Sequence, residues 1–149
     1  MRKTTFLVVI AVLGLILNTG CKKKTDAPET EAVAFDISAA KLKISEGYRE
    51  FEKAYNTKDS VALANCYTTD AKFMPPNMPA MEGKDNIIKG FGQMMKGDTT
   101  QIKLNLVDAW GNEENLIAEN AWTISDAAGK VLDEGKSIEV YKMEDGKWK

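Results

Sequence analysis

The sequence predicts an α+β fold in which three helices cover one face of a curved antiparallel sheet. Two observations lead to this prediction. Between residues 36 and 96, apolar side chains recur every three or four positions, which is the spacing of helices that bury one face. From residue 101 onward the period changes to two, as in strands, and turn sequences such as Asp145-Gly146 separate the segments. Helices followed by hairpin-linked strands favour α+β over an alternating fold with a parallel sheet.

The first two helices are marked by capping residues. Asp36 is a good N-cap, and the helical period after it continues to about Tyr55. The sequence at 56–59 interrupts this period, and Asp59 or Ser60 then caps a second, shorter helix. We therefore expect two consecutive helices before residue 68.

A short strand and a third helix complete the first half. Residues 71–74 are a brief strand candidate, and the proline-rich segment 75–79 must be a loop because proline has no N–H for a ladder. The third helix follows Gly83, from Lys84 to about residue 96. The second half predicts strands at 101–106, 116–125 and 135–143. A further strand begins at 147 and is incomplete at Lys149, because only three residues remain for it.

The N-terminal residues are typical of an exported protein. Two basic residues precede an apolar run over 6–17, which is shorter than the roughly 20 residues of a membrane span and suits a signal peptide. Small residues and Cys21 follow, and this order resembles a bacterial lipoprotein signal. We expect a signal peptide at 1–20, lipid on Cys21, a flexible tether over 21–35, and a location on the extracytoplasmic side of the bacterial cell envelope. The alternative is an ordinary secretory signal in which the cysteine is incidental.

Composition excludes several function classes for the whole chain, and with it for the predicted domain at 36–149. The formal net charge of −2 argues against nucleic-acid binding, which needs a basic face. The absence of histidine removes Ser-His-Asp and Cys-His catalysis and most zinc sites. Two cysteines are too few for a metal cluster or a disulfide framework. We expect no metal and no cofactor.

The order of four short motifs over about residues 38–149 resembles a known family. The motifs are Tyr67-x-x-Asp70-Ala71, Glu82-Gly83-Lys84, Val140-Tyr141-Lys142 and Asp145-Gly146-Lys147-Trp148. Together they are similar to the SnoaL-like, ketosteroid-isomerase-like superfamily, also called nuclear transport factor 2-like, in a branch of unknown function. The resemblance implies a cone-shaped sheet wrapped around the helices, a pocket at one end, and a homodimer. It also implies a longer final strand than this chain has.

The resemblance does not extend to the catalytic residues of ketosteroid isomerases. In ketosteroid isomerases an aspartate acts as base, and a tyrosine on the first helix helps to form the oxyanion hole. Aligned on Tyr67-x-x-Asp70, the base position falls on Pro75 and the tyrosine position on Phe51. Neither residue can perform the corresponding role, since proline accepts no proton and phenylalanine donates no hydrogen bond.

Counting by two along the strands predicts which side chains line the pocket. The alternating, mainly apolar sets that we expect to face inward come from three strands. They are Ile102, Leu104, Leu106, Asp108 and Trp110; Leu116, Ala118, Asn120, Trp122 and Ile124; and Lys136, Ile138 and Val140. Asp108, Asn120 and Lys136 are the polar members of these sets. Walls are expected from Phe51, Tyr55, Phe73 and Met74. An apolar cavity with a few polar groups is the usual form of a small-ligand site.

Each candidate pocket residue also has an alternative role that involves no ligand. Asp108 lies near a strand end, where solvation is common, and Lys136 can extend its amine outward. Asn120 can hydrogen-bond the neighbouring backbone, and Trp122 can serve only as core. Asp108 is the only candidate for a catalytic base.

Three hypotheses for function follow. The first is a lipid-anchored binding domain that holds a small, largely apolar ligand without transforming it. The second is an isomerase- or cyclase-type enzyme that uses a pocket carboxylate such as Asp108, whose pKa burial would have to raise. The third is a dimeric interaction or scaffold protein whose cone is filled by its own side chains.

Overall fold

The computed structural model describes residues 34–149. The predicted signal peptide, Cys21 and nearly all of the predicted tether lie outside these residues. Within 34–149, no helix is long and apolar enough to cross a membrane.

Three helices form as the capping residues predict. Helix α1 spans Ile37–Asn56, and the Asp36 carboxylate accepts hydrogen bonds from the first backbone N–H groups of this helix. Helix α2 spans Ser60–Ala64 and is capped in the same way by Asp59. Helix α3 spans Lys84–Met94 and follows Gly83, whose positive φ of 78° favours glycine.

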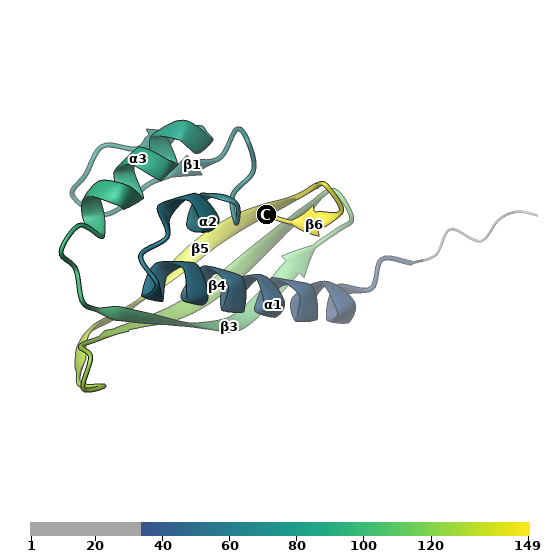
Figure 1. Ribbon diagram of the computed structural model, residues 1–149. Helices are drawn as coiled ribbons and strands as arrows, with labels where there is room; N and C mark the ends of the chain where they lie inside the picture. Colours follow the sequence, from purple (N-terminus) through teal and green to yellow (C-terminus); the bar gives the residue numbers. More distant parts are fainter. Residues whose placement is uncertain (1–33) are drawn as a thin grey trace, which may run out of the picture. The chain divides into compact units, whose positions relative to one another are not determined.

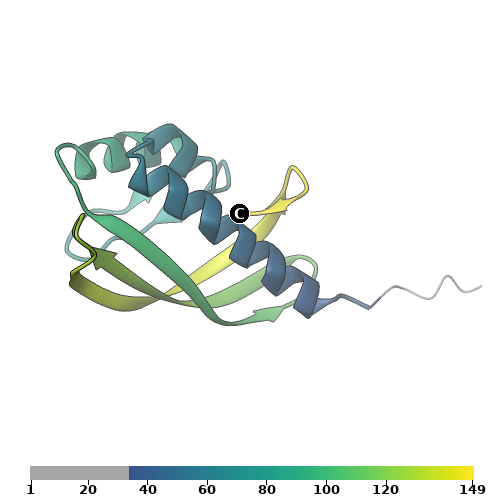
Figure 2. The same ribbon diagram turned by 60° about the horizontal axis from the view of Figure 1, so that its bottom comes forward.

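The strands form two antiparallel sheets. The larger has the order β3-β4-β5-β6, with β3 at Gln101–Gly111, β4 at Asn115–Ser125, β5 at Val131–Glu144 and β6 at Lys147–Trp148. The smaller pairs β1, Lys72–Phe73, with β2, Met81–Glu82. The sequence did not predict β2. The large sheet is strongly curled into a half-barrel, and α1 runs along its concave face (Figures 1 and 2). The predicted α+β class is confirmed.

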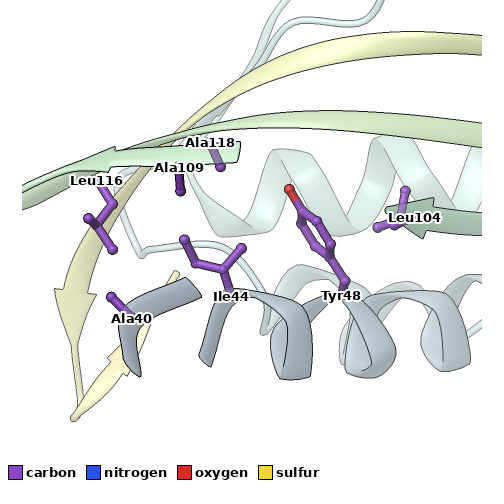
Figure 3. Packing of buried hydrophobic residues seen from close by; sticks show 7 residues of the cluster. All are labelled: Ala40, Ile44, Tyr48, Leu104, Ala109, Leu116 and Ala118. Atoms are coloured by element: carbon purple, nitrogen blue, oxygen red, sulfur yellow. The ribbon is translucent and has the colours of Figure 1, made fainter. Parts of the chain in front are cut away.

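Two hydrophobic clusters hold the elements together. One joins the buried face of α1 to the concave face of the sheet, and Figure 3 shows its members: Ala40, Ile44, Tyr48, Leu104, Ala109, Leu116 and Ala118. The other joins α2, α3 and the end of α1 through Ala54, Leu63, Ala64, Ile87, Phe91 and Met95. Phe51 packs against both clusters, so it marks their junction.

A bulge in β3 reverses the predicted inward face at the end of that strand. The register with β4 shifts between Leu106 and Asp108. Beyond the shift Ala109 is buried, whereas the side chain of Asp108 is 56% exposed and Trp110 is 46% exposed. The prediction that Asp108 and Trp110 face the interior is therefore wrong, because one extra residue changes which side chains point inward.

The inward face of β5 is also the opposite of the predicted one. Gly135 pairs with Trp122 and Ser137 pairs with Asn120, so the odd-numbered residues of β5 share the concave face. Ile138 and Val140 are 63% and 64% exposed. Lys136 is on the outer face with them. The prediction followed the apolar side chains, but here the outer face of the strand is the more apolar one.

Candidate ligand-binding site

A single carboxylate on the concave face of the sheet collects four hydrogen bonds. The hydroxyl groups of Tyr48 and Tyr141 donate to Oε2 of Glu139 at 2.7 and 2.8 Å. Ser137 Oγ and Asn120 Nδ2 donate to Oε1 at 2.9 and 3.1 Å. All four donors are neutral side chains, and they come from α1, β4 and β5. We call these five residues the Glu139 cluster.

The fold explains why these side chains meet. On α1, Ala40, Ile44 and Tyr48 are spaced by four, and all three are buried against the sheet. Figure 3 shows the Tyr48 ring directed from the helix toward the strands. Asn120 is 1% exposed, and its Oδ1 accepts a hydrogen bond at 3.2 Å from the backbone N–H of Asn105 on β3. The amide is thereby oriented so that its Nδ2 faces β5.

The two tyrosines of the cluster remain protonated donors. Burial raises the pKa of Tyr48 far above its usual value, and the nearby charge of Glu139 raises it further. Burial and the same charge raise the pKa of Tyr141 as well. A tyrosine that keeps its proton can donate a hydrogen bond to a carboxylate, as both of these tyrosines do to Glu139.

Tyr67 places a further hydroxyl in this region. It follows α2, and burial and the charge of Glu139 both raise its pKa. Its hydroxyl makes no hydrogen bond to any residue in 34–149, yet no fully enclosed side-chain oxygen or nitrogen of that range lacks a partner. Among residues 34–149, the hydrogen-bonding capacity of the Tyr67 hydroxyl is therefore unused.

Aromatic rings surround the ring of Tyr67. The Tyr67 ring lies 6.3 Å from that of Phe51 and 6.0 Å from that of Phe73, measured between ring centroids. Phe73 in turn stacks on Phe91 at 4.9 Å. Phe51, Tyr67 and Phe73 are each only half-buried. These rings offer an apolar surface that is not fully covered by the protein itself.

Trp122 contributes an apolar surface on the sheet. Its indole lies across Gly135 of β5, so close that an added Cβ would collide with the ring. The glycine is needed for this close approach. Trp122 is half-buried and packs against the hydrophobic cluster between α1 and the sheet.

A separate surface groove lies near the start of α1. The groove has a volume of about 340 Å³ and is open to solvent. It is lined mainly by Phe35, Ala39, Ala40, Met143 and Trp148. The Phe35 and Trp148 rings meet edge to face at 6.2 Å. None of the residues that line this groove is a predicted pocket residue or a member of the Glu139 cluster. We take the cluster as the candidate site because it brings charge and hydrogen-bond donors together.

Comparison with known proteins identifies the family. A family model described as a SnoaL-like domain matches residues 48–149. The chain belongs to the SnoaL-like domain family. No curated protein matches it.

Solved structures resemble this SnoaL-like domain in fold. A Nostoc punctiforme protein of unknown function with a cystatin-like fold has a TM-score of 0.66 at 18% identity, covering 72% of this chain and 83% of that one. A Catenulispora acidiphila structure in complex with S-DNPA has a TM-score of 0.63 at 14% identity, covering 74% and 87%. A ketosteroid isomerase-like protein from Erwinia carotovora atroseptica has a TM-score of 0.56 at 20% identity, covering 72% and 87%. At these identities the likeness shows the fold alone.

The structure places the predicted pocket residues in two groups. Asn120 belongs to the Glu139 cluster, and Phe51 and Trp122 pack against the hydrophobic cluster that contains Tyr48. Phe73 packs against the other hydrophobic cluster, where its ring lies 6.0 Å from that of Tyr67. Tyr55 lies elsewhere: its hydroxyl donates to Asp98 Oδ2 at 3.2 Å, in the connection between α3 and β3. Met74 is 71% exposed.

The two charged candidates lie outside the site of the SnoaL-like domain. Asp108 pairs with Lys41 at 2.6 Å, and the hydrogen bond from that lysine lowers the pKa of the carboxyl. A general base in a pocket needs the opposite shift, so the structure argues against Asp108 as a base. The Lys136 side chain is 73% exposed and lies 3.6 Å from Glu119 Oε1.

Sequence reasoning missed Tyr48, Ser137, Glu139 and Tyr141. The signal was present, because Gly135, Ser137, Glu139 and Tyr141 alternate along β5 as one face. The prediction instead chose the other face of β5, because the set Lys136, Ile138 and Val140 has more apolar members. Tyr48 was read only as part of the buried face of the first helix, where a hydroxyl has no evident partner until the sheet is placed.

Proposed function

We propose that this SnoaL-like domain binds a small, largely apolar ligand and is held by lipid at the extracytoplasmic side of the bacterial cell envelope. The observation that carries the binding function is the Glu139 cluster on the concave face, together with half-buried aromatic rings and a Tyr67 hydroxyl that no residue of 34–149 binds. A few polar groups within a mainly apolar surface are typical of small-ligand sites. The Catenulispora acidiphila structure of similar fold, in complex with S-DNPA, supports the proposal that this domain binds a small ligand.

Native mass spectrometry of the full chain, extracted in mild detergent, tests the binding function. We expect a folded species that carries a small extra mass besides the lipid. Phe73→Ala removes a half-buried ring at the site and should reduce the fraction of protein with that mass. Met74→Ala, at the exposed neighbouring position, is the matched control and should leave it unchanged.

A chain that is always empty, and that no compound of an apolar library stabilises against heat, contradicts the binding function. The scaffold hypothesis would then be favoured. Equal loss of the extra mass in both variants would place the ligand away from these rings.

The lipid anchor rests on the sequence around Cys21. In a bacterial host, the wild-type chain should sediment with membranes and carry a lipid-sized mass on its first residue, whereas Cys21→Ser should lose both. Cys66→Ser is the matched control. Burial raises the pKa of the Cys66 thiol to about 11, which keeps it unreactive. Membrane association of Cys21→Ser, or its loss in Cys66→Ser, contradicts the proposal.

The outer face of the sheet is suited to a second copy of the chain. Trp110, Ile117 and Val140 are aligned across β3, β4 and β5, and Ile138 lies beside them. Lys136 and Glu119 flank this patch, so a two-fold related copy can set unlike charges against each other. We therefore propose a homodimer through this face.

Sedimentation measurements test the dimer. Ile138→Asp should convert it to a monomer, while Leu42→Asp, at an equally exposed position on α1, should not. A wild-type monomer at about 100 μM, or dimers of Ile138→Asp, would refute the proposed interface.

A further inference from the structure

Glu139 has no cationic partner in the part of the chain that the structure describes. Ten ion pairs join lysine or arginine to carboxylates in residues 34–149, and none includes Glu139. Most of the paired carboxylates are at the surface, where an ion pair adds little. Glu139 is half-buried on the concave face, where a partner would matter more.

The hydrogen bonds around Glu139 do not cancel its charge. Four neutral groups donate to it, at distances from 2.7 to 3.1 Å. These bonds make the ionised form tolerable in a partly desolvated position. They leave one full negative charge on the concave face, and such charges in proteins are normally matched by an opposite charge.

The surroundings of this charge favour an organic cation. The hydroxyl of Tyr67 has no hydrogen-bond partner among residues 34–149 and can accept a hydrogen bond from an ammonium N–H. The rings of Phe51, Phe73 and Trp122 are half-buried, and aromatic rings attract alkylammonium groups. An anionic ligand would be repelled by Glu139, and a neutral one would leave its charge unmatched.

We infer that the ligand of this site is an apolar amine or quaternary ammonium compound, with its positive charge directed toward Glu139 and its apolar body among the aromatic rings. This inference rests on the proposed binding function and specifies the chemical class of the ligand.

Isothermal titration of the full chain with two probes tests the inference. The probes are 4-phenylbutylamine, which is cationic at neutral pH, and 4-phenylbutanol, which has the same apolar body without the charge. We expect the wild-type chain to bind the amine at least tenfold more tightly than the alcohol. Glu139→Gln should abolish this preference by weakening the amine alone. Glu134→Gln, an exposed acid on the outer face of the same strand, is the matched control and should preserve it.

A second variant covers the possibility that Glu139→Gln does not fold. Tyr67→Phe removes a hydroxyl that has no partner in residues 34–149, and it should weaken binding of the amine several-fold while the chain stays folded.

Equal affinities of the wild-type chain for the two probes overturn the inference, as does an amine preference that survives in Glu139→Gln. In both cases binding of the alcohol leaves the proposed binding function intact. Binding of neither probe also overturns the inference, and mass spectrometry of the extracted chain then decides the binding function independently.

Discussion

The hydrogen bond between Tyr48 and Glu139 makes a measurable prediction for stability. Tyr48 is 3% exposed, and its hydroxyl donates to the carboxylate at 2.7 Å. Tyr48→Phe removes this bond without changing the shape of the ring, so no cavity forms. A hydrogen bond to a charged group contributes about 1.5–3 kcal/mol. Tyr141 continues to donate to the same oxygen at 2.8 Å, which favours the lower half of that range.

We therefore expect Tyr48→Phe to lower the free energy of unfolding by about 1.5–2 kcal/mol. For a domain of this size each kcal/mol corresponds to about 4 °C in Tm, so the midpoint should fall by about 6–8 °C. Urea unfolding followed by circular dichroism measures the free energy, and a thermal scan measures the midpoint. The slope of the urea transition should not change, because the same surface is exposed on unfolding.

Tyr67→Phe is the matched control for this experiment. It makes the same chemical change at a hydroxyl that no residue of 34–149 binds, so the loss should stay below about 0.5 kcal/mol. Similar losses in the two variants would show that removal of any tyrosine hydroxyl from this domain has the same cost. A loss below about 0.5 kcal/mol in Tyr48→Phe would refute the structural role given to the cluster.

Three further predictions concern the framework of the site. Burial alone would raise the pKa of Asp98, but hydrogen bonds from Lys58 and Thr100 hold it at about 2. A carboxyl group with a lowered pKa stabilises the fold above about pH 4, and this stabilisation is lost as the pH falls toward 2. Asp98→Asn should therefore lower the free energy of unfolding by about 1 kcal/mol at pH 7 after solvent screening. The difference from wild type in urea unfolding should vanish near pH 2. Leu63 is fully buried, so Leu63→Ala should lower the free energy of unfolding by about 3 kcal/mol, and a loss below 1 would contradict its place in the core. Gly135→Ala should displace the Trp122 indole, destabilise the domain by about 1–3 kcal/mol and change tryptophan fluorescence; an unchanged spectrum would contradict the close contact.

Short-range features of the sequence were sufficient to predict the elements. The side chain of Asp36 caps α1 and that of Asp59 caps α2, each through hydrogen bonds to residues two and three positions ahead. The change of apolar period near residue 100 coincides with the start of the sheet. The two-residue strand β2 was missed, because a strand so short exists only through its pairing with β1.

The face that each strand presents was less predictable. On β4 the alternation is simple, and Asn120 and Trp122 were correctly assigned to the concave face with Leu116 and Ala118. On β3 the bulge after Leu106 changes the alternation within the strand, so that the predicted inward position of Asp108 is wrong. No local residue pattern announces a bulge of this kind, because its location depends on how the sheet curls.

The sequence by itself determined the fold class, the order of the elements apart from β2, and the family, since these depend on local periods, caps and motif spacing. Only the tertiary structure decided the site. Tyr48 and Glu139 are separated by 91 positions in the chain, and their contact exists because α1 lies along the concave face of the sheet. Burial of polar groups is favourable only when their partners are present, and those partners come from three elements whose arrangement no local pattern specifies.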